Sequence, residues 1–197
     1  MTNARATVWA CLLALPAAAV AKDSFRIEYF DLRGSTAREL RADLSRRGPV
    51  GETGIRGDGN TEYNIAWRFS MKFKDGICSP QDVEVDLAVT MHLPRWEPPS
   101  GVSSELRETW ERFSDDLREH EDGHHKIARS AAKAVKRKLR RRTEAASCEV
   151  LKTRMNTAAT DVLREYRTKQ QEYDLETDYG RATGARLIQR PTSRDER

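Results

Sequence analysis

Beyond its first residues, the chain has no stretch apolar enough to span a membrane. It also has little cysteine, with 3 residues among 197. Its glycine-rich segment, residues 50–60, has neither the spacing of a phosphate-binding loop nor the Lys-Ser/Thr ending of one. No internal repeat is visible. These absences exclude a polytopic membrane protein, a P-loop nucleotide-binding protein and a repeat architecture.

The first residues have the features of a signal peptide. Arg5 precedes the apolar run "ATVWACLLALPAAAV", which is too short to span a bilayer. Ala19, Val20 and Ala21 form a small-x-small cleavage site. We therefore expect residues 1–21 to be a signal peptide that is cleaved after Ala21, and the mature protein to be periplasmic or secreted without a membrane span.

Export changes the interpretation of the remaining cysteines. Cys11 would leave with the signal peptide, so the mature chain would keep Cys78 and Cys148. Two cysteines in an oxidising compartment indicate one disulfide, and the alternative is two unpaired buried thiols. We expect the disulfide. The length fits one domain, which we place at residues 22–180, followed by a flexible basic tail at 181–197.

The chain is basic, but its positive charge is local. The sequence pI is about 9.0 and the net charge is +4. The excess lies in "KRKLRRR", residues 136–142, and in the arginines after Gly180. Basic patches bind nucleic acid or anionic lipid. Here no aromatic residues interleave for base stacking, and cations are favoured near a helix C-terminus by its dipole. We therefore expect a solvated helix end and no nucleic-acid partner.

Apolar alternation predicts three strands in the first half of the chain, at residues 23–32, 61–74 and 83–93. Asp75 and Gly76 form a strong turn signal that makes the last two strands an antiparallel hairpin. Thr36 and Glu39 fit a capping box at the start of a short helix that ends at Gly48.

The second half changes to a helical period. An apolar stripe from Leu106 to Ala131 indicates one helix from about Ser103 to Arg142. A second helix should begin near Cys148 and fade at "DLETDYG". The expected fold is therefore α+β, with a small antiparallel sheet and one short helix packed on two long C-terminal helices.

Three of the 4 histidines lie in the long helix, and two of them belong to its apolar stripe. His120, Glu121 and His124 spell H-E-x-x-H, the spacing of zinc metallopeptidases. Four helical residues turn His124 only about 40° from His120, so both rings point inward and can share one Zn²⁺ ion. Glu121 would act as general base on zinc-bound water, whose pKa the ion lowers. The motif predicts a hydrolase.

Three neighbouring features have weaker interpretations. Gly123 costs about 1 kcal/mol in a helix, which fits a group that approaches the backbone closely at the metal and fits a tolerated defect equally well. His125 lies about 140° around from His120 and is a poor third ligand. His92 falls on the polar face of its strand, where we expect an exposed histidine.

The chain resembles a bacterial family of unknown function whose members are regarded, from the same motif, as secreted zinc-dependent proteases. The resemblance covers nearly all of the mature chain, in the order "YFDLRGST", "TEYNIAW", "GIC", "HLPRW", "EHEDGHHKIA", Cys148 and "YDLETDYG". It implies a zincin-like α+β domain and metal-dependent hydrolysis.

One position departs from the family pattern. The family usually has histidine before the glycine of the last segment, a plausible third ligand, and this chain has Tyr179. A phenolate ligates zinc less readily than imidazole. Tyr179 would supply the third contact or hydrogen-bond an oxyanion, with Glu172, Glu176 or Asp178 completing the site. The alternative is that Tyr179 is an ordinary turn aromatic before Gly180.

Two functions follow from these residues. The first is a periplasmic zinc metalloprotease that acts on a peptide or protein substrate in the cell envelope, aligned along the strand that ends at His92. The second is a non-catalytic envelope interaction module with a structural or degenerate metal site, which Tyr179 in place of histidine favours.

Overall fold

The computed structural model describes residues 23–51, 54–141 and 143–187. The predicted signal peptide and the last ten residues of the predicted tail, 188–197, lie outside these ranges. The elements follow in the order β1 (Ser24–Leu32), α1 (Ala37–Arg47), β2 (Asn60–Lys74), β3 (Ile77–Trp96), α2 (Ser104–Leu139), α3 (Cys148–Glu176) and a 3-10 helix, η1 (Arg181–Thr183). Within the described ranges, no helix has the length and apolar character needed to cross a bilayer.

The sheet has three strands in the order β1-β3-β2. β2 and β3 form the predicted antiparallel hairpin, in which Lys74 pairs with Ile77 across the turn. The expectation of a purely antiparallel sheet is wrong, because β1 pairs in parallel with β3. The chain reverses at the start of β2 and again at the hairpin, so β3 runs in the direction of β1 and receives it on its free edge. Alternation defines the faces of a strand but not its neighbour.

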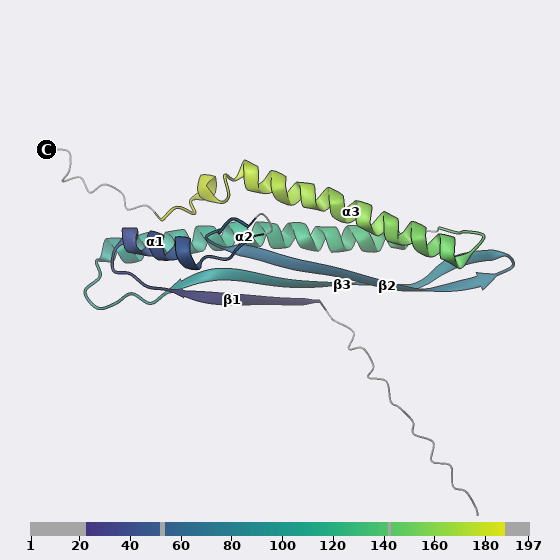
Figure 1. Ribbon diagram of the computed structural model, residues 1–197, viewed down its shortest axis with the longest axis horizontal. Helices are drawn as coiled ribbons and strands as arrows, with labels where there is room; N and C mark the ends of the chain where they lie inside the picture. The colour runs from purple at the N-terminus through teal and green to yellow at the C-terminus, as the bar shows by residue number, and fades with distance from the viewer. Residues whose placement is uncertain (1–22, 52–53, 142, 188–197) are drawn as a thin grey trace, which may run out of the picture.

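Both long helices cover the same face of the sheet, and α3 runs back along α2 (Figure 1). Alternate residues of β3, including Leu87, Val89 and Met91, point into this layer and are buried. The predicted stripe of α2 meets Met91 with the fully buried Phe113, and α2 meets Leu87 and Val89 with Ala128 and Ala131. α1 closes one end of the layer through Leu40 and Leu44. The predicted α+β fold, with one short helix and two long C-terminal helices, is confirmed.

Side-chain caps set the starts of the helices. The hydroxyl of Thr36 accepts from the backbone N–H of Glu39 at 3.2 Å. The Glu39 carboxylate returns to the backbone N–H of Ser35, at 2.7 Å, so the predicted capping box closes one residue early. Ser103 and Ser147 cap α2 and α3 in the same way. Each hydroxyl satisfies an N–H that a helix end leaves unpaired.

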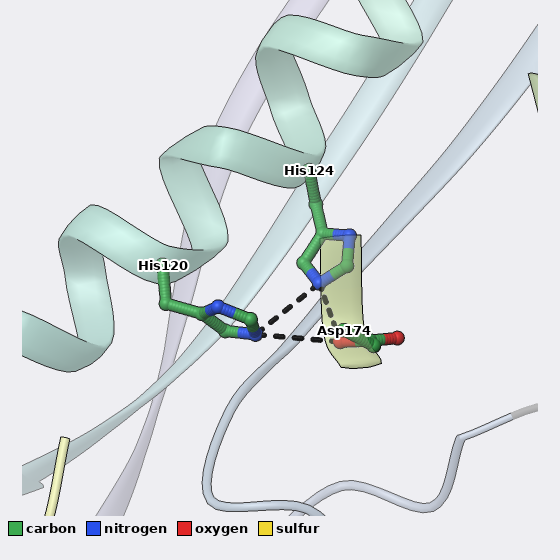
Figure 2. Close-up of side chains that lie close together, drawn as sticks. All are labelled: His120, His124 and Asp174. Carbon is green, nitrogen blue, oxygen red and sulfur yellow. Dashed lines mark hydrogen bonds and ion pairs between the residues drawn. The ribbon is translucent and has the colours of Figure 1, made fainter. Parts of the chain in front are cut away.

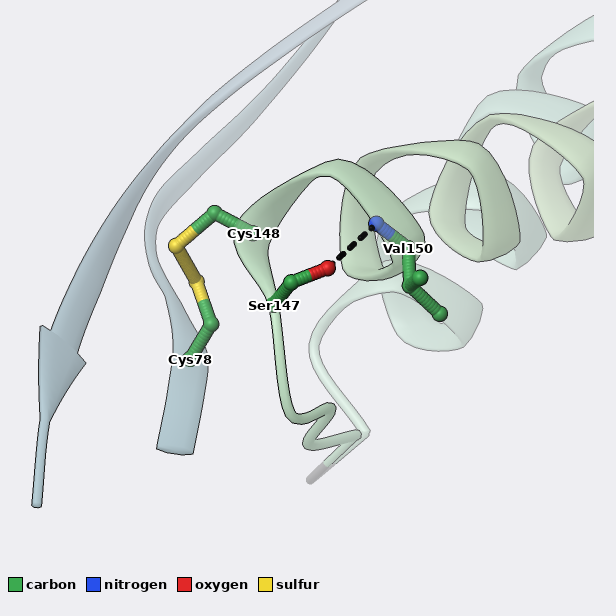
Figure 3. The surroundings of a disulfide bond; sticks show 4 residues. All are labelled: Cys78, Ser147, Cys148 and Val150. Carbon is green, nitrogen blue, oxygen red and sulfur yellow. Dashed lines mark hydrogen bonds between the residues drawn. A yellow bond between two sulfur atoms is a disulfide. The ribbon is translucent and has the colours of Figure 1, made fainter. Parts of the chain in front are cut away.

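The predicted disulfide between Cys78 and Cys148 is present (Figure 3). Cys78 is fully buried, and it exchanges two backbone hydrogen bonds with Ala145, at 2.8 and 3.1 Å. The bridge therefore joins the start of β3 to the first residue of α3. It fixes one end of α3 on the hairpin.

Part of the predicted tail is packed on the domain. Residues 181–187 include η1, and Ala185 and Leu187 are 4% and 6% exposed in the core cluster that contains Phe113. The boundary expected at residue 181 is therefore too early. Apolar residues between the arginines hold this segment on α2, so a tail would begin no earlier than residue 188.

We predict that replacing Cys78 and Cys148 with serine lowers the free energy of unfolding by about 4 kcal/mol, because the bridge closes a loop of 70 residues. Urea unfolding of the variant and of the oxidised protein measures the difference. Equal midpoints under oxidising conditions would show that the bridge does not restrict the unfolded chain.

Candidate metal centre

Three potential ligand atoms converge between α2 and α3 (Figure 2). The Nε2 atoms of His120 and His124 are 3.3 Å apart. The Oδ1 atom of Asp174 lies 3.0 Å from Nε2 of His124 and 3.5 Å from Nε2 of His120. The two histidines come from successive turns of α2, as predicted, and the carboxylate comes from α3.

Hydrogen bonds at the far side of each imidazole define its tautomer. Gln170 donates its amide N–H to the carbonyl of His124, so its oxygen faces Nδ1 of His124 at 2.6 Å and must accept a hydrogen from it. Thr177 donates its hydroxyl hydrogen to the carbonyl of Tyr173 at 2.6 Å, which leaves Oγ1 to accept from Nδ1 of His120 at 3.3 Å. In the neutral rings, both Nε2 atoms therefore carry lone pairs.

The converging atoms fit a zinc ion. Two Nε2 lone pairs and a carboxylate oxygen repel one another unless a cation lies between them. Ligands at the usual zinc distances in a tetrahedral site are about 3.3 Å apart, close to the 3.0–3.5 Å found here. The Nδ1 partners, Gln170 and Thr177, orient the rings as outer-shell groups do in zinc proteins.

The charges of the cluster respond to the same geometry. Burial alone would raise the pKa of Asp174, but hydrogen bonds from His120 and His124, which the rings donate through Nε2 when they are protonated, reverse the effect and lower the pKa to about 2. Burial would lower the pKa of His124, but its bonds to Asp174 and Gln170 outweigh burial and raise it. A proton can thus supply the positive charge that the site requires, and it competes with a metal for the same atoms.

Tyr173 packs against both histidines, and Gly123 makes room for it. The Tyr173 ring stacks on His120 with the centroids 5.1 Å apart, and it meets the His124 ring edge-on at 5.0 Å. A Cβ atom on Gly123 would lie 2.1 Å from the Tyr173 hydroxyl oxygen. Of the two interpretations of Gly123, the structure therefore supports the close approach, and the approaching group is Tyr173.

Glu121 points from α2 toward the start of β2 and is only 4% exposed. The Thr61 hydroxyl lies 2.7 Å from its Oε2 atom. A Cβ atom on Gly59 would lie 2.9 Å from its Oε1 atom, so glycine leaves the space that the carboxylate occupies. Burial raises the pKa of Glu121 from its ordinary value toward neutral pH.

The structure places Asp174, and none of the four expected residues, against the histidines. Glu172 and Glu176 are exposed on α3, and Asp178 pairs with Arg181 at 2.6 Å. Tyr179 is 58% exposed. It follows the end of α3 with a left-handed backbone, φ 54°, and its ring lies beside Arg181. The third member of the site therefore comes from inside the helix rather than from the turn after it.

The other two histidines lie outside the cluster. His125 stacks on Phe25 of β1, with the centroids 4.6 Å apart. His92 lies on the open face of the sheet, between Glu28 and Glu62 at 3.6 and 3.8 Å. It belongs to β3, the central strand, which at His92 is paired on both edges, with Glu28 of β1 and Asn60 of β2. The expectation that a peptide aligns along this strand is therefore wrong.

Sequence reasoning missed Asp174, Gln170, Tyr173 and Thr177. Their spacing does carry a signal, because positions 170, 173, 174 and 177 share one face of α3 by steps of three and four. Such a row of polar side chains on one face of the second long helix would have indicated a partner for the histidines.

The chain matches a family model whose description names no function. The family model "Bacterial protein of unknown function (DUF922)" matches residues 27–180. No curated protein and no solved structure matched the chain. The matched range contains every residue of the candidate metal centre.

We predict that Asp174→Ala weakens zinc binding by more than the roughly 10–100-fold that loss of an outer-shell partner costs, because it removes a ligand. Asp178→Ala and Tyr179→Phe serve as matched controls, and both should bind zinc as the unchanged protein does. Competition with a chromogenic chelator, using protein without a histidine tag, measures the affinities. Loss of binding in Tyr179→Phe with none in Asp174→Ala would restore the tyrosine as ligand.

We predict that Gly123→Ala destabilises the protein by about 1–3 kcal/mol through overpacking against Tyr173. In a Tyr173→Ala background the same change should become stabilising, since alanine gains about 1 kcal/mol over glycine in an open helix. Urea unfolding of the four proteins in this cycle gives the sign. A stabilising Gly123→Ala in both backgrounds would contradict the close contact.

Proposed function

The chain belongs to this bacterial family of unknown function, and we propose that it is a secreted or periplasmic zinc-dependent metalloprotease with a zincin-like site. The observation that carries the proposal is the convergence of two Nε2 lone pairs and one carboxylate oxygen, with the carboxylate of Glu121 next to them in sequence. A purely structural polar cluster does not require a glutamate at that position.

His120, His124 and Asp174 would hold the metal. A bound zinc ion supplies a Lewis acid for a substrate carbonyl and lowers the pKa of water in its open position. The three side chains leave the site a net charge of +1 with zinc, because only Asp174 is anionic. A weakly neutralised ion keeps more of its acidity than one held by several thiolates or carboxylates.

Glu121 would take up the proton of the attacking water and return it to the leaving amine. Its raised pKa suits this task, because a general base transfers protons best when its pKa is near the working pH. The Thr61 hydroxyl fixes one carboxylate oxygen, at 2.7 Å, and so sets the direction of the other. In this proposal His120, His124 and Asp174 bind the metal, and Glu121 carries the proton.

An extended peptide could bind along β2 rather than β3. β2 is an edge strand, and its second residue, Thr61, contacts Glu121. Main-chain pairing with a sheet edge recognises peptides of many sequences. We therefore propose unfolded or extended segments of envelope proteins as the substrate class.

The burial of the site favours a second candidate function. His120 and Glu121 are 5% and 4% exposed, and both Glu121 oxygens are enclosed. An ion held there without access for substrate would be structural, and the protein would then be a non-catalytic envelope interaction module. Both functions predict that the protein binds a metal ion, but only the protease predicts that it cleaves a substrate.

We predict that Glu121→Gln keeps stoichiometric zinc and lowers the cleavage rate of an unfolded protein by about 10²–10⁴-fold. The amide has nearly the same shape as the carboxylate but cannot accept the proton. Glu119→Gln, an exposed neighbour on α2, is the control and should retain full activity. A fluorescently labelled unfolded protein, with and without chelator, reports the cleavage. Full zinc occupancy without chelator-sensitive cleavage in the unchanged protein would reject the protease and favour the module.

A further inference from the structure

Positive charge is concentrated at the end of the molecule where the β2–β3 hairpin turns, α2 ends and α3 begins (Figure 1). Residues 72–78, 133–141 and 143–154, together called the basic end, contain 10 Lys and Arg against 3 Asp and Glu, a net charge of +7. The whole chain carries +4, which leaves −3 for all other residues. Among the described cations of the basic end, only Lys74 has an ion-pair partner, Asp75 at 3.8 Å.

The helix dipole explains only part of this charge. It favours the cations in the last turn of α2, as expected from the sequence. Lys152 and Arg154, however, lie in the second turn of α3, near its N-terminal end, where the dipole does not favour cations. Lys72 and Lys74 belong to a strand, which has no comparable dipole. Like charges from three elements repel one another, so their convergence indicates an anionic partner.

A cavity opens within the basic end. It has a volume of about 210 Å³ and lies between the last turn of α2 and the first turns of α3. Its lining includes the cations Lys138, Arg141 and Arg154, together with Thr143 and the apolar Met155. Three cations and a hydroxyl around one cavity match the chemistry of a phosphate group, which accepts several charged hydrogen bonds.

The tip of the hairpin adds exposed apolar side chains. Phe73 and Ile77 flank the turn and are 59% and 47% exposed, and Val150 on the first turn of α3 is 46% exposed. Lys72 and Lys74 alternate with Phe73 along the strand. Large apolar side chains that project next to exposed cations are typical of surfaces that contact lipid.

We propose that the basic end docks on an anionic phospholipid bilayer, with a lipid phosphate in the cavity and the hairpin tip at the level of the headgroups. A bilayer offers a dense layer of negative charge for the cations and an apolar interior for the exposed apolar side chains. Nucleic acid supplies the first, but Phe73 is the only aromatic residue in the basic end, which is a poor stacking surface. The proposal departs from the sequence-based interpretation of these cations as a solvated helix end, which considered one element, whereas the structure brings together cations of three.

Docking at this end would leave the candidate metal centre free. Along α2, Arg140 lies 16 residues after His124, which corresponds to about 24 Å of helix. The proposal therefore does not depend on the metalloprotease function, and neither result decides the other.

The test uses the chain that begins at Lys22, which keeps every described residue and omits the apolar run before it. Co-sedimentation measures its binding to vesicles of phosphatidylglycerol with phosphatidylcholine, and to vesicles of phosphatidylcholine alone. We expect binding to the anionic vesicles that weakens as salt rises. Lys138→Glu, Arg141→Glu and Arg154→Glu together should weaken it by about tenfold or more. Phe73→Ser with Ile77→Ser should weaken it at high salt as well.

A charge-matched control carries Arg33→Glu, Arg38→Glu and Arg107→Glu, three cations near α1 and the start of α2, at the opposite end (Figure 1). It should bind anionic vesicles more tightly than the basic-end variant, and circular dichroism should show that both variants are folded. Equal loss in the two variants would overturn the proposal, as would equal binding to neutral vesicles. The last comparison uses duplex DNA at the same phosphate concentration. Nucleic acid would replace the bilayer as the partner if the protein bound DNA more tightly than vesicles and if Phe73→Ser with Ile77→Ser left DNA binding unchanged.

Discussion

The register of α3 against α2 is the constraint on which the candidate metal centre depends. Two imidazoles on α2 can meet a carboxylate on α3 only if the helices pair at one offset. A shift of α3 by one residue would move each side chain by about 1.5 Å along the axis and about 100° around it. The disulfide at Cys148 fixes the start of α3, and the contact of Tyr173 with Gly123 fixes its last turns. The offset is therefore held at both ends.

Three glycines next to the site leave the space that its side chains occupy. Gly59 leaves space for Glu121, Gly123 for Tyr173, and Gly180 for His120, whose ring would lie 3.0 Å from an added Cβ. Each glycine loses more conformational entropy on folding than another residue would, but it allows close packing in the folded state. They come from a loop, a helix interior and a turn. A polar cluster with little solvent access requires this close packing, because protein groups must then supply the hydrogen bonds that water makes at an exposed site.

The sequence predicts local features of the fold and site well. The strand alternation of residues 61–74, the cap at Thr36 and the inward direction of His120 and His124 follow from local geometry, and the structure bears them out. The parallel pairing of β1 and the position of Asp174 could not be predicted in the same way. Both depend on contacts between residues far apart in the chain, where periodicity identifies the buried face but not what covers it. The gathering of cations at the basic end could not be predicted for a related reason, since a run of cations on one helix does not reveal the cations that other elements add.

The central claim is that His120, His124 and Asp174 bind one zinc ion together. Zinc K-edge X-ray absorption of the untagged protein tests it directly, since the spectrum reports the number and type of ligand atoms. The account predicts two imidazole nitrogens and one or two oxygens at about 2.0–2.2 Å, with no sulfur. A spectrum with six oxygen ligands and no imidazole scattering would show that the ion lies elsewhere and would contradict the account.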